Sequence, residues 1–192
     1  MQYIARLPAP MKLYYNEKVY SPEYSSIDTI LVADKMIRDG GKPNTTVLDV
    51  GCGTGMIGLG IKLLNPEAEV TLSDIDSEAV RITSLNAKRL GLDVTVHQSD
   101  MLPTGYWEII TANLPTYADE DMSQELHGPK IAYYSKEPLA LYERLFNVSK
   151  ERCKALVCEC QEKYQEEFLA MAKNSGWRLA LHTDFAFAFI QY

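Results

Sequence analysis

The chain has 192 residues, of which 46% are hydrophobic, and it carries a formal net charge of −7 at pH 7. This length suits one domain that buries about 70% of the surface of its unfolded chain, and we predict a single domain over 1–192. The negative charge disfavours a long nucleic-acid contact surface, and without an apolar run of roughly 18 residues or a signal peptide we expect a cytoplasmic protein with no membrane contact.

The first 24 residues mix tyrosines and prolines without a sustained period. This pattern predicts an irregular lead-in, which we expect to cover a ligand site formed by later residues. Ser25 and Asp28 then have the spacing of a helix N-terminal capping box, with aspartate where glutamate is usual. The helix that they begin ends at Gly40 and Gly41 and precedes the first strand.

A glycine-rich turn follows the first strand. Residues 47–50 are mostly apolar and β-branched, which predicts a buried parallel strand. Gly51, Gly53 and Gly55 follow at once, and a helix opens at Met56. Glycines at these positions let the chain turn tightly and let a ligand approach the backbone, while the helix N-terminus offers unpaired N–H groups. The turn therefore predicts a nucleotide-like ligand.

Strands and helices alternate through the rest of the chain. Further strands are predicted at 69–73, 94–98, 107–112, 155–160, 177–182 and 185–191, and helices at 56–64, 77–90, 138–150 and 162–174. Only Thr183 and Asp184 separate the last two strands, so these run antiparallel, because a parallel crossover needs more residues. We therefore predict an α/β, Rossmann-like fold: a seven-stranded, mostly parallel sheet with a C-terminal antiparallel hairpin and helices on both faces.

Three groups of side chains have a structural interpretation. The helix at 77–90 is expected to bury Val80, Thr83, Ala87 and Leu90, and the last strand Phe185, Phe187 and Phe189. The cysteines, Cys52, Cys153, Cys158 and Cys160, do not have the pattern of a disulfide framework. The last three could be metal ligands, but alternate residues of a strand share a face and free cysteine is commonly buried. We expect reduced thiols and no metal site.

Polar residues stand at three further strand ends. Asp74, Asp100 and Asn113 each follow a predicted strand, and in a parallel sheet these ends meet at the edge that carries the glycine turn. Asp74 lies 19 positions after Gly55, a spacing at which a carboxylate accepts hydrogen bonds from ribose hydroxyls. Asp100 is placed to reach a base.

The connection from 118 to 135 is longer than a compact domain usually tolerates. It contains Asp119, Glu120, Asp121 and Glu125. We predict that it is a lid over the same edge of the sheet.

Four segments together resemble class I S-adenosylmethionine-dependent methyltransferases over nearly the whole chain: Val-Leu-Asp-Val-Gly-Cys-Gly-Thr-Gly, Ser-Asp-Ile-Asp-Ser-Glu-Ala-Val, Ser-Asp-Met-Leu and Asn-Leu-Pro-Thr-Tyr. The stretches 19–22 and 137–142 (Glu-Pro-Leu-Ala-Leu-Tyr), with the Asn-x-Pro turn, are similar to the HemK/PrmC-like group. That group contains protein-glutamine N5-methyltransferases, which modify the Gly-Gly-Gln loop of peptide release factors, and relatives that methylate exocyclic amines of nucleobases.

The resemblance implies a role for each strand-end residue. Asp49 and the glycine turn, with the backbone of Gly51, Gly53 and Gly55, would hold the methionine end of S-adenosylmethionine; Asp74 would hold the ribose; and Asp100 with Met101 would address the adenine. Asn113 and the Leu114 carbonyl would bind the acceptor nitrogen, with Pro115 completing the turn and Tyr117 packing on a planar amide or base.

One departure leaves the substrate class open. The family pattern is Asn-Pro-Pro followed by Tyr or Phe, whereas here Leu114 replaces the first proline and Thr116 precedes Tyr117. Asn-Leu-Pro is also similar to adenine-modifying RNA methyltransferases. The candidates are a protein glutamine, favoured by the acidity of the chain, an exocyclic amine of a nucleic acid base (adenine N6 or guanine N2), or a scaffold protein that has lost activity, against which Asp74 and Asp100 argue.

The resemblance also bears on partners. From its length we expect the chain to lack the N-terminal helical domain with which bacterial PrmC-like enzymes grip release factors. If it is of the minimal archaeal or eukaryotic kind, the resemblance implies a small zinc-binding activator subunit, which an exposed apolar sheet edge would support.

Overall fold

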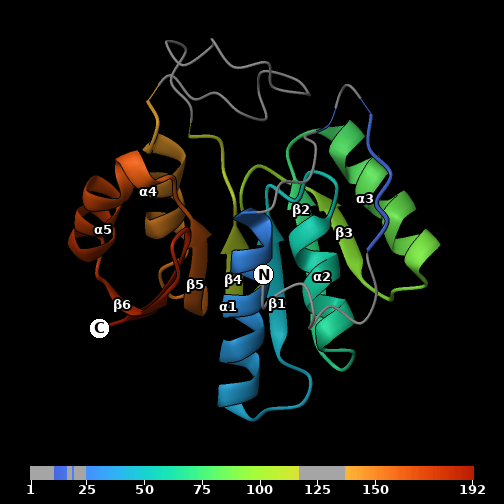
Figure 1. Ribbon diagram of the computed structural model, residues 1–192, viewed down its shortest axis with the longest axis horizontal. Coiled ribbons are helices and arrows are strands. Elements are labelled where there is room, and N and C mark those ends of the chain that lie inside the picture. Colours follow the sequence, from blue (N-terminus) through green and yellow to red (C-terminus); the bar gives the residue numbers. More distant parts are fainter. Residues whose placement is uncertain (1–10, 17–18, 20–24, 117–136) are drawn as a thin grey trace.

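The computed structural model describes residues 11–16, 19, 25–116 and 137–192. The predicted lid, Tyr117 and most of the lead-in lie outside these ranges. The described elements, shown in Figure 1, are α1 (Ser25–Gly40), β1 (Thr46–Val50), α2 (Met56–Leu64), β2 (Glu69–Asp74), α3 (Ser77–Leu90), β3 (Thr95–Gln98), β4 (Trp107–Ala112), α4 (Ala140–Val148), β5 (Cys153–Glu159), a 3₁₀ turn (Glu162–Tyr164), α5 (Gln165–Asn174), β6 (Trp177–His182) and β7 (Ala186–Gln191).

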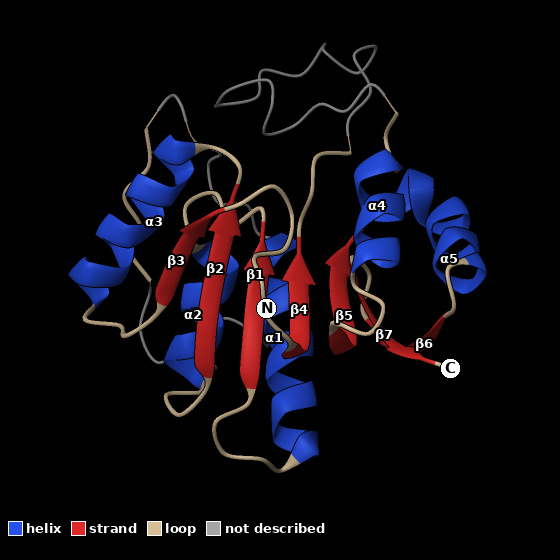
Figure 2. Ribbon diagram, turned by 180° about the vertical axis from the view of Figure 1, so that it is seen from behind, coloured by secondary structure: helices blue, strands red, loops and turns tan. Residues whose placement is uncertain are grey.

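The predicted sheet is confirmed. Its strand order is β3-β2-β1-β4-β5-β7-β6. The first five of these strands pair in parallel, and β7 pairs antiparallel with both β5 and β6. Figure 2 shows the carboxyl ends of the parallel strands at one edge of the sheet. That edge is where the predicted site residues were expected to meet.

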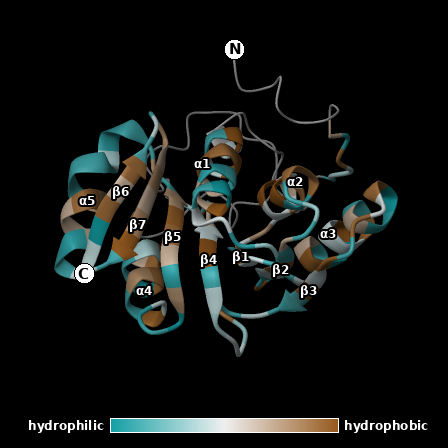
Figure 3. Ribbon diagram, turned by 90° about the horizontal axis from the view of Figure 1, so that it is seen from below, coloured by the Kyte–Doolittle hydropathy of each residue, from teal (hydrophilic) through white to brown (hydrophobic). Residues whose placement is uncertain are grey.

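Alternation along each strand divides the core between the two faces of the sheet. In β1, Val47 packs with residues of α1 and α2, while its neighbour Leu48 packs with α4 and α5. Figure 3 shows α1 and α2 on one side of the sheet and α4 on the other. None of the helices in the described part of the chain combines the length and hydropathy that a membrane span requires.

Helix α3 begins and ends as its sequence predicts. The Asp76 side chain accepts a hydrogen bond from the Glu78 backbone N–H at 2.9 Å, and Gly91 caps the other end in the left-handed conformation. The expected buried face is partly wrong. The buried residues are Ala79, Ile82, Thr83, Asn86 and Ala87, whereas Val80 and Leu90 are half-buried.

The C-terminal hairpin differs from its prediction at the turn. Strand β7 begins at Ala186, and the Thr183 N–H donates to the Ala186 carbonyl. Phe185 therefore lies in the turn and is exposed, while Phe187 and Phe189 are buried as predicted. The turn is one residue longer than predicted, so Phe185 is not part of the strand. The four cysteines are free and buried.

Candidate functional site

The glycine turn and the Asn-Leu-Pro turn lie against each other. A Cβ atom placed on Gly51 would lie 2.9 Å from Cδ2 of Leu114, and the φ of Gly51 is +69°, a conformation that favours glycine. These turns leave the carboxyl ends of β1 and β4, which are neighbours in the sheet. The structure thus brings together the residues predicted to bind a cofactor and those predicted to bind an acceptor.

Side chains of helix α3 donate hydrogen bonds to carbonyl oxygens of the glycine turn. The Thr83 hydroxyl donates to the Gly53 carbonyl at 2.9 Å, and the Asn86 side-chain amide donates to the Thr54 carbonyl at 2.9 Å. The same Asn86 side chain pairs with the N–H and the carbonyl of Tyr14. The described part of the lead-in is therefore tied to the glycine turn through one buried amide, next to the site that the lead-in was expected to cover.

Asp74 lies at the strand end where it was expected, and there it binds the glycine turn. One carboxylate oxygen accepts from the Gly53 N–H at 2.9 Å and the other from the Asp76 N–H at 2.9 Å. Burial raises the pKa of Asp74, and the hydrogen bonds from these amides oppose that shift. Each carboxylate oxygen still has a lone pair to accept a further hydrogen bond.

Asp49 lies beneath the turn and is fully buried. Its oxygens accept from the Gly58 N–H at 3.0 Å and from the Thr111 hydroxyl at 3.0 Å. Burial raises the pKa of Asp49 to about 7. No lysine or arginine in the described part of the chain forms an ion pair with Asp49 or Asp74. When ionised, the two carboxyl groups give the carboxyl ends of these strands a negative potential that a cation would offset.

Asp100 differs from both in its surroundings. Its two carboxylate oxygens accept from the Arg144 guanidinium of α4, each at 2.8 Å, and the side chain is 55% exposed. This guanidinium holds the pKa of Asp100 below its usual range. The next residue, Met101, has a φ of +66°, and its carbonyl accepts from the Ser73 hydroxyl at 3.1 Å. A non-glycine residue held in this conformation marks a candidate ligand contact.

The acceptor turn, Asn113-Leu114-Pro115, is held by α1 and α4. The Asn113 side-chain NH₂ donates to the Ser26 hydroxyl at 3.4 Å, which leaves the side-chain oxygen of Asn113 for another donor. The Leu114 N–H donates to the Tyr142 hydroxyl at 2.9 Å. Tyr117, predicted to pack on the acceptor, lies outside the described residues.

Three residues near the site have no role in the sequence-based prediction, although Ile75 and Tyr142 stand within the motifs quoted above. Asn86 and Tyr142 each carry a polar group on a buried helix face, a signal that stands out once the helix face is known. Ile75 follows Asp74 at the end of β2 and is 56% exposed. An exposed isoleucine at a strand end beside a half-buried carboxylate suits the apolar face of a planar ring.

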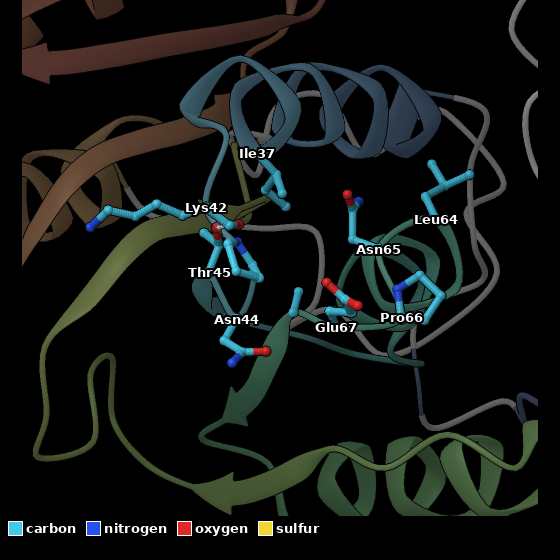
Figure 4. Close-up of a pocket in the computed structure, with 10 residues that line it drawn as sticks. Ile37, Lys42, Asn44, Thr45, Leu64, Asn65, Pro66 and Glu67 are labelled. Atoms are coloured by element: carbon cyan, nitrogen blue, oxygen red, sulfur yellow. Dashed lines mark hydrogen bonds between the residues drawn. The ribbon is translucent and has the colours of Figure 1, made fainter.

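A concavity of about 380 Å³ lies away from these turns, at the amino ends of β1 and β2 (Figure 4). It is lined by the loops after α1 and α2. The polar groups of Asn65 and Thr45 in its wall already bond to Asp34 and to the Lys42 carbonyl. The concavity is therefore not part of the candidate site.

Strand β3, which forms one outer side of the sheet, does not present an apolar surface. Thr95, His97 and Gln98 are exposed, and Val96 is half-buried. The exposed apolar edge that would support an activator subunit is therefore not found at this strand.

Comparison with known proteins gives a consistent family. A family model described as Methyltransferase small domain matches residues 11–164. The release factor glutamine methyltransferase of Deinococcus radiodurans is 37% identical over 151 residues, which cover 72% of this chain and 53% of that protein. The chain spans about half the length of the curated relatives it matches.

Solved structures share the fold. The hMettl16 catalytic domain in complex with the MAT2A 3′UTR hairpin 1 superimposes with a TM-score of 0.73 at 12% identity, over 98% of this chain and 76% of that chain. The T. thermophilus 16S rRNA N2 methyltransferase in complex with AdoMet and guanosine gives a TM-score of 0.65 at 15% identity, over 89% and 43%. At these identities the likeness is one of fold.

Proposed function

The chain belongs to the methyltransferase small domain family, and from this premise we propose that it transfers a methyl group from S-adenosylmethionine to the side-chain amide nitrogen of a protein glutamine. The observation that carries the proposal is the contact between Gly51 and Leu114, because it sets the cofactor turn against a turn whose oxygens suit an NH₂ group. Relatives named release factor glutamine methyltransferase favour a release factor as the substrate.

The residues at the glycine turn fit this cofactor. S-adenosylmethionine, when bound, supplies a methyl group on a positively charged sulfur. Asp49 and Asp74 are carboxylates without a cationic partner in the described residues, so a cationic ligand lowers the free energy of their ionised forms. Asp74 has lone pairs for the ribose hydroxyls, Ile75 offers an apolar face to the adenine, and Asp100 with the Met101 backbone lies at the next strand end.

The acceptor turn orients the amide nitrogen of the substrate. An amide nitrogen is a poor nucleophile because its lone pair is delocalised, so it must be held in line with the methyl group and opposite the departing sulfur. The Asn113 side-chain oxygen and the Leu114 carbonyl would each accept one N–H of the NH₂ group. Pro115 restricts the backbone of Leu114 and so helps to fix its carbonyl.

The same two oxygens stabilise the transition state. Positive charge grows on the nitrogen as its bond to the methyl carbon forms, and fixed carbonyl dipoles stabilise that charge more than they stabilise the neutral amide. The methylated nitrogen becomes acidic and loses its proton to water after the bond to sulfur has broken. A strong general base is therefore not needed.

The test is transfer of tritium from labelled S-adenosylmethionine to a purified release factor, with a variant whose Gly-Gly-Gln glutamine is replaced by alanine as the control. We expect label in the natural protein and none in the variant. Labelling of cell extract that is removed by nuclease and not by protease would overturn the proposal and favour an exocyclic amine of a nucleic acid base. Adding candidate zinc-binding activator proteins to the same assay tests the predicted subunit.

A further inference from the structure

We infer that Tyr142 is a positioning residue for the acceptor turn, because its hydroxyl holds the peptide group that joins Asn113 to Leu114. This inference rests on the proposed function, in which that turn receives the acceptor nitrogen. The side-chain oxygen of Asn113 and the carbonyl oxygen of Leu114 lie on the two sides of this peptide group. Its orientation therefore sets the distance and angle between the two oxygens.

The hydroxyl of Tyr142 bridges two strand ends. It accepts from the Leu114 N–H at 2.9 Å, just beyond β4, and donates to the Glu159 carbonyl at the end of β5. The tyrosine is fully buried, and its ring meets the Phe168 ring edge-on with centroids 5.1 Å apart. A side chain packed in this way has little freedom, so the position of its oxygen is fixed by the core.

The Leu114 N–H needs this partner because the sheet supplies none. The pairing of β4 with β5 ends at Ala112 and Cys158, two residues before Leu114. Leu114 is itself buried, and a buried N–H without an acceptor is costly. Without the hydroxyl, the peptide group would rotate to find another partner for its N–H, and the change in ψ of residue 113 and φ of residue 114 would alter the spacing of the two acceptor oxygens.

The sequence offers a direct way to test the bond. A proline at position 114 has no N–H, so it removes the need for the hydroxyl. Pro115 already restricts residue 114 to the extended region, which is compatible with the φ of proline. Tyr142→Phe should therefore lower turnover in the natural chain and have little effect in a chain that carries Leu114→Pro.

The experiment compares the natural protein, Tyr142→Phe, Leu114→Pro and the double variant, on whichever acceptor takes the methyl label. We expect Tyr142→Phe to lower kcat about tenfold, the scale of a displaced transition-state contact, with S-adenosylhomocysteine affinity within about twofold. In the Leu114→Pro background the same change should cost less than about twofold. Tyr164→Phe, which removes a hydroxyl from a ring packed on the same core, is the matched control.

A second measurement is independent of activity. Hydrogen exchange of the Leu114 amide, followed by NMR with S-adenosylhomocysteine present, should be faster in Tyr142→Phe than in the natural protein and unchanged in Tyr164→Phe. Equal loss of kcat in both backgrounds, or unchanged Leu114 exchange in Tyr142→Phe, would overturn the inference. Absence of label on a glutamine substrate would instead overturn the proposed function, while the exchange measurement would still decide the role of Tyr142.

Discussion

Two halves of the candidate site are held in different ways. The glycine-turn half, built by β1, β2 and α3, is secured by donors from one neighbouring helix, with Thr83 and Asn86 three residues apart on its buried face. The acceptor half, built by β4, α4 and the start of α1, is held by side chains of two different helices, Tyr142 of α4 and Ser26 of α1. One half is therefore secured by a single neighbouring helix, whereas the other depends on how two separate helices pack against it.

The halves also differ in charge. The glycine-turn half contains the carboxyl groups of Asp49 and Asp74, and burial raises the pKa of both. The acceptor half presents neutral dipoles, from the Asn113 side chain and from backbone carbonyls. A cationic cofactor suits the first and a neutral NH₂ group the second, so the division of charge matches the proposed reaction.

Asn86→Ala should break the glycine-turn half most severely. The change removes two hydrogen bonds with Tyr14 and one with Thr54. A wholly buried polar group that loses its partner costs about 1 to 3 kcal/mol. We expect the free energy of unfolding to fall by about 3 kcal/mol in urea denaturation. Ser84→Ala, at an exposed position of the same helix, is the control. Equal effects of the two changes would mean that Asn86 does not secure the turn.

Asn113→Ala should break the acceptor half alone. Loss of one transition-state acceptor is expected to lower kcat on the order of 10², and S-adenosylhomocysteine affinity measured by calorimetry should hardly change. Full turnover in this variant would remove Asn113 from the mechanism. A parallel loss of cofactor affinity would show that the two halves are not independent.

Both halves contain contacts that the sequence could not predict, since the partners of the turns, such as Asn86 and Tyr142, depend on helix packing. The strands, the glycine turn and the place of Asp74 at the next strand end follow from local patterns in the sequence, and the structure has them as expected. The partner of the Leu114 N–H, a hydroxyl 28 residues later, depends on how α4 packs. The ion pair of Asp100 with Arg144 spans 44 residues and has no local signal either. The exposed Phe185 has a different cause, since one added turn residue interrupted a correct alternation.

Asp74→Ala tests the ribose contact in the glycine-turn half. The variant loses an acceptor for the ribose hydroxyls and also frees the Gly53 N–H. We expect S-adenosylmethionine binding to weaken by about 1 to 3 kcal/mol in calorimetry. Asp93→Ala, an exposed aspartate after α3, should bind normally. Unchanged affinity in Asp74→Ala would mean that the cofactor lies elsewhere.

Asp49→Asn tests the raised pKa of Asp49, which distinguishes the glycine-turn half from the neutral acceptor half. The pKa of Asp49 is about 7 in the folded protein against an ordinary value of 3.8. A carboxyl that binds its proton more tightly when folded stabilises the fold fully below about pH 4, and this contribution is lost as the pH rises toward 7. Asparagine does not ionise, so the stability of the variant should fall less between pH 4 and 7 than that of the natural protein. If the free energies of unfolding from urea denaturation changed equally with pH in the two proteins, the raised pKa of Asp49 would be refuted.

Arg144→Ala concerns the ion pair that joins the two halves, since Asp100 follows β3 and Arg144 lies in α4. Both side chains are about half exposed, and exposed pairs contribute about 0 to 1 kcal/mol. We expect a loss of stability below about 1 kcal/mol that disappears at high salt. Asp100 stays ionised at neutral pH without its partner, so S-adenosylhomocysteine affinity should stay within about twofold. A large, salt-insensitive loss of affinity would instead mean that α4 sets the geometry of the cofactor site through Asp100, and the two halves would then have to be treated as one unit.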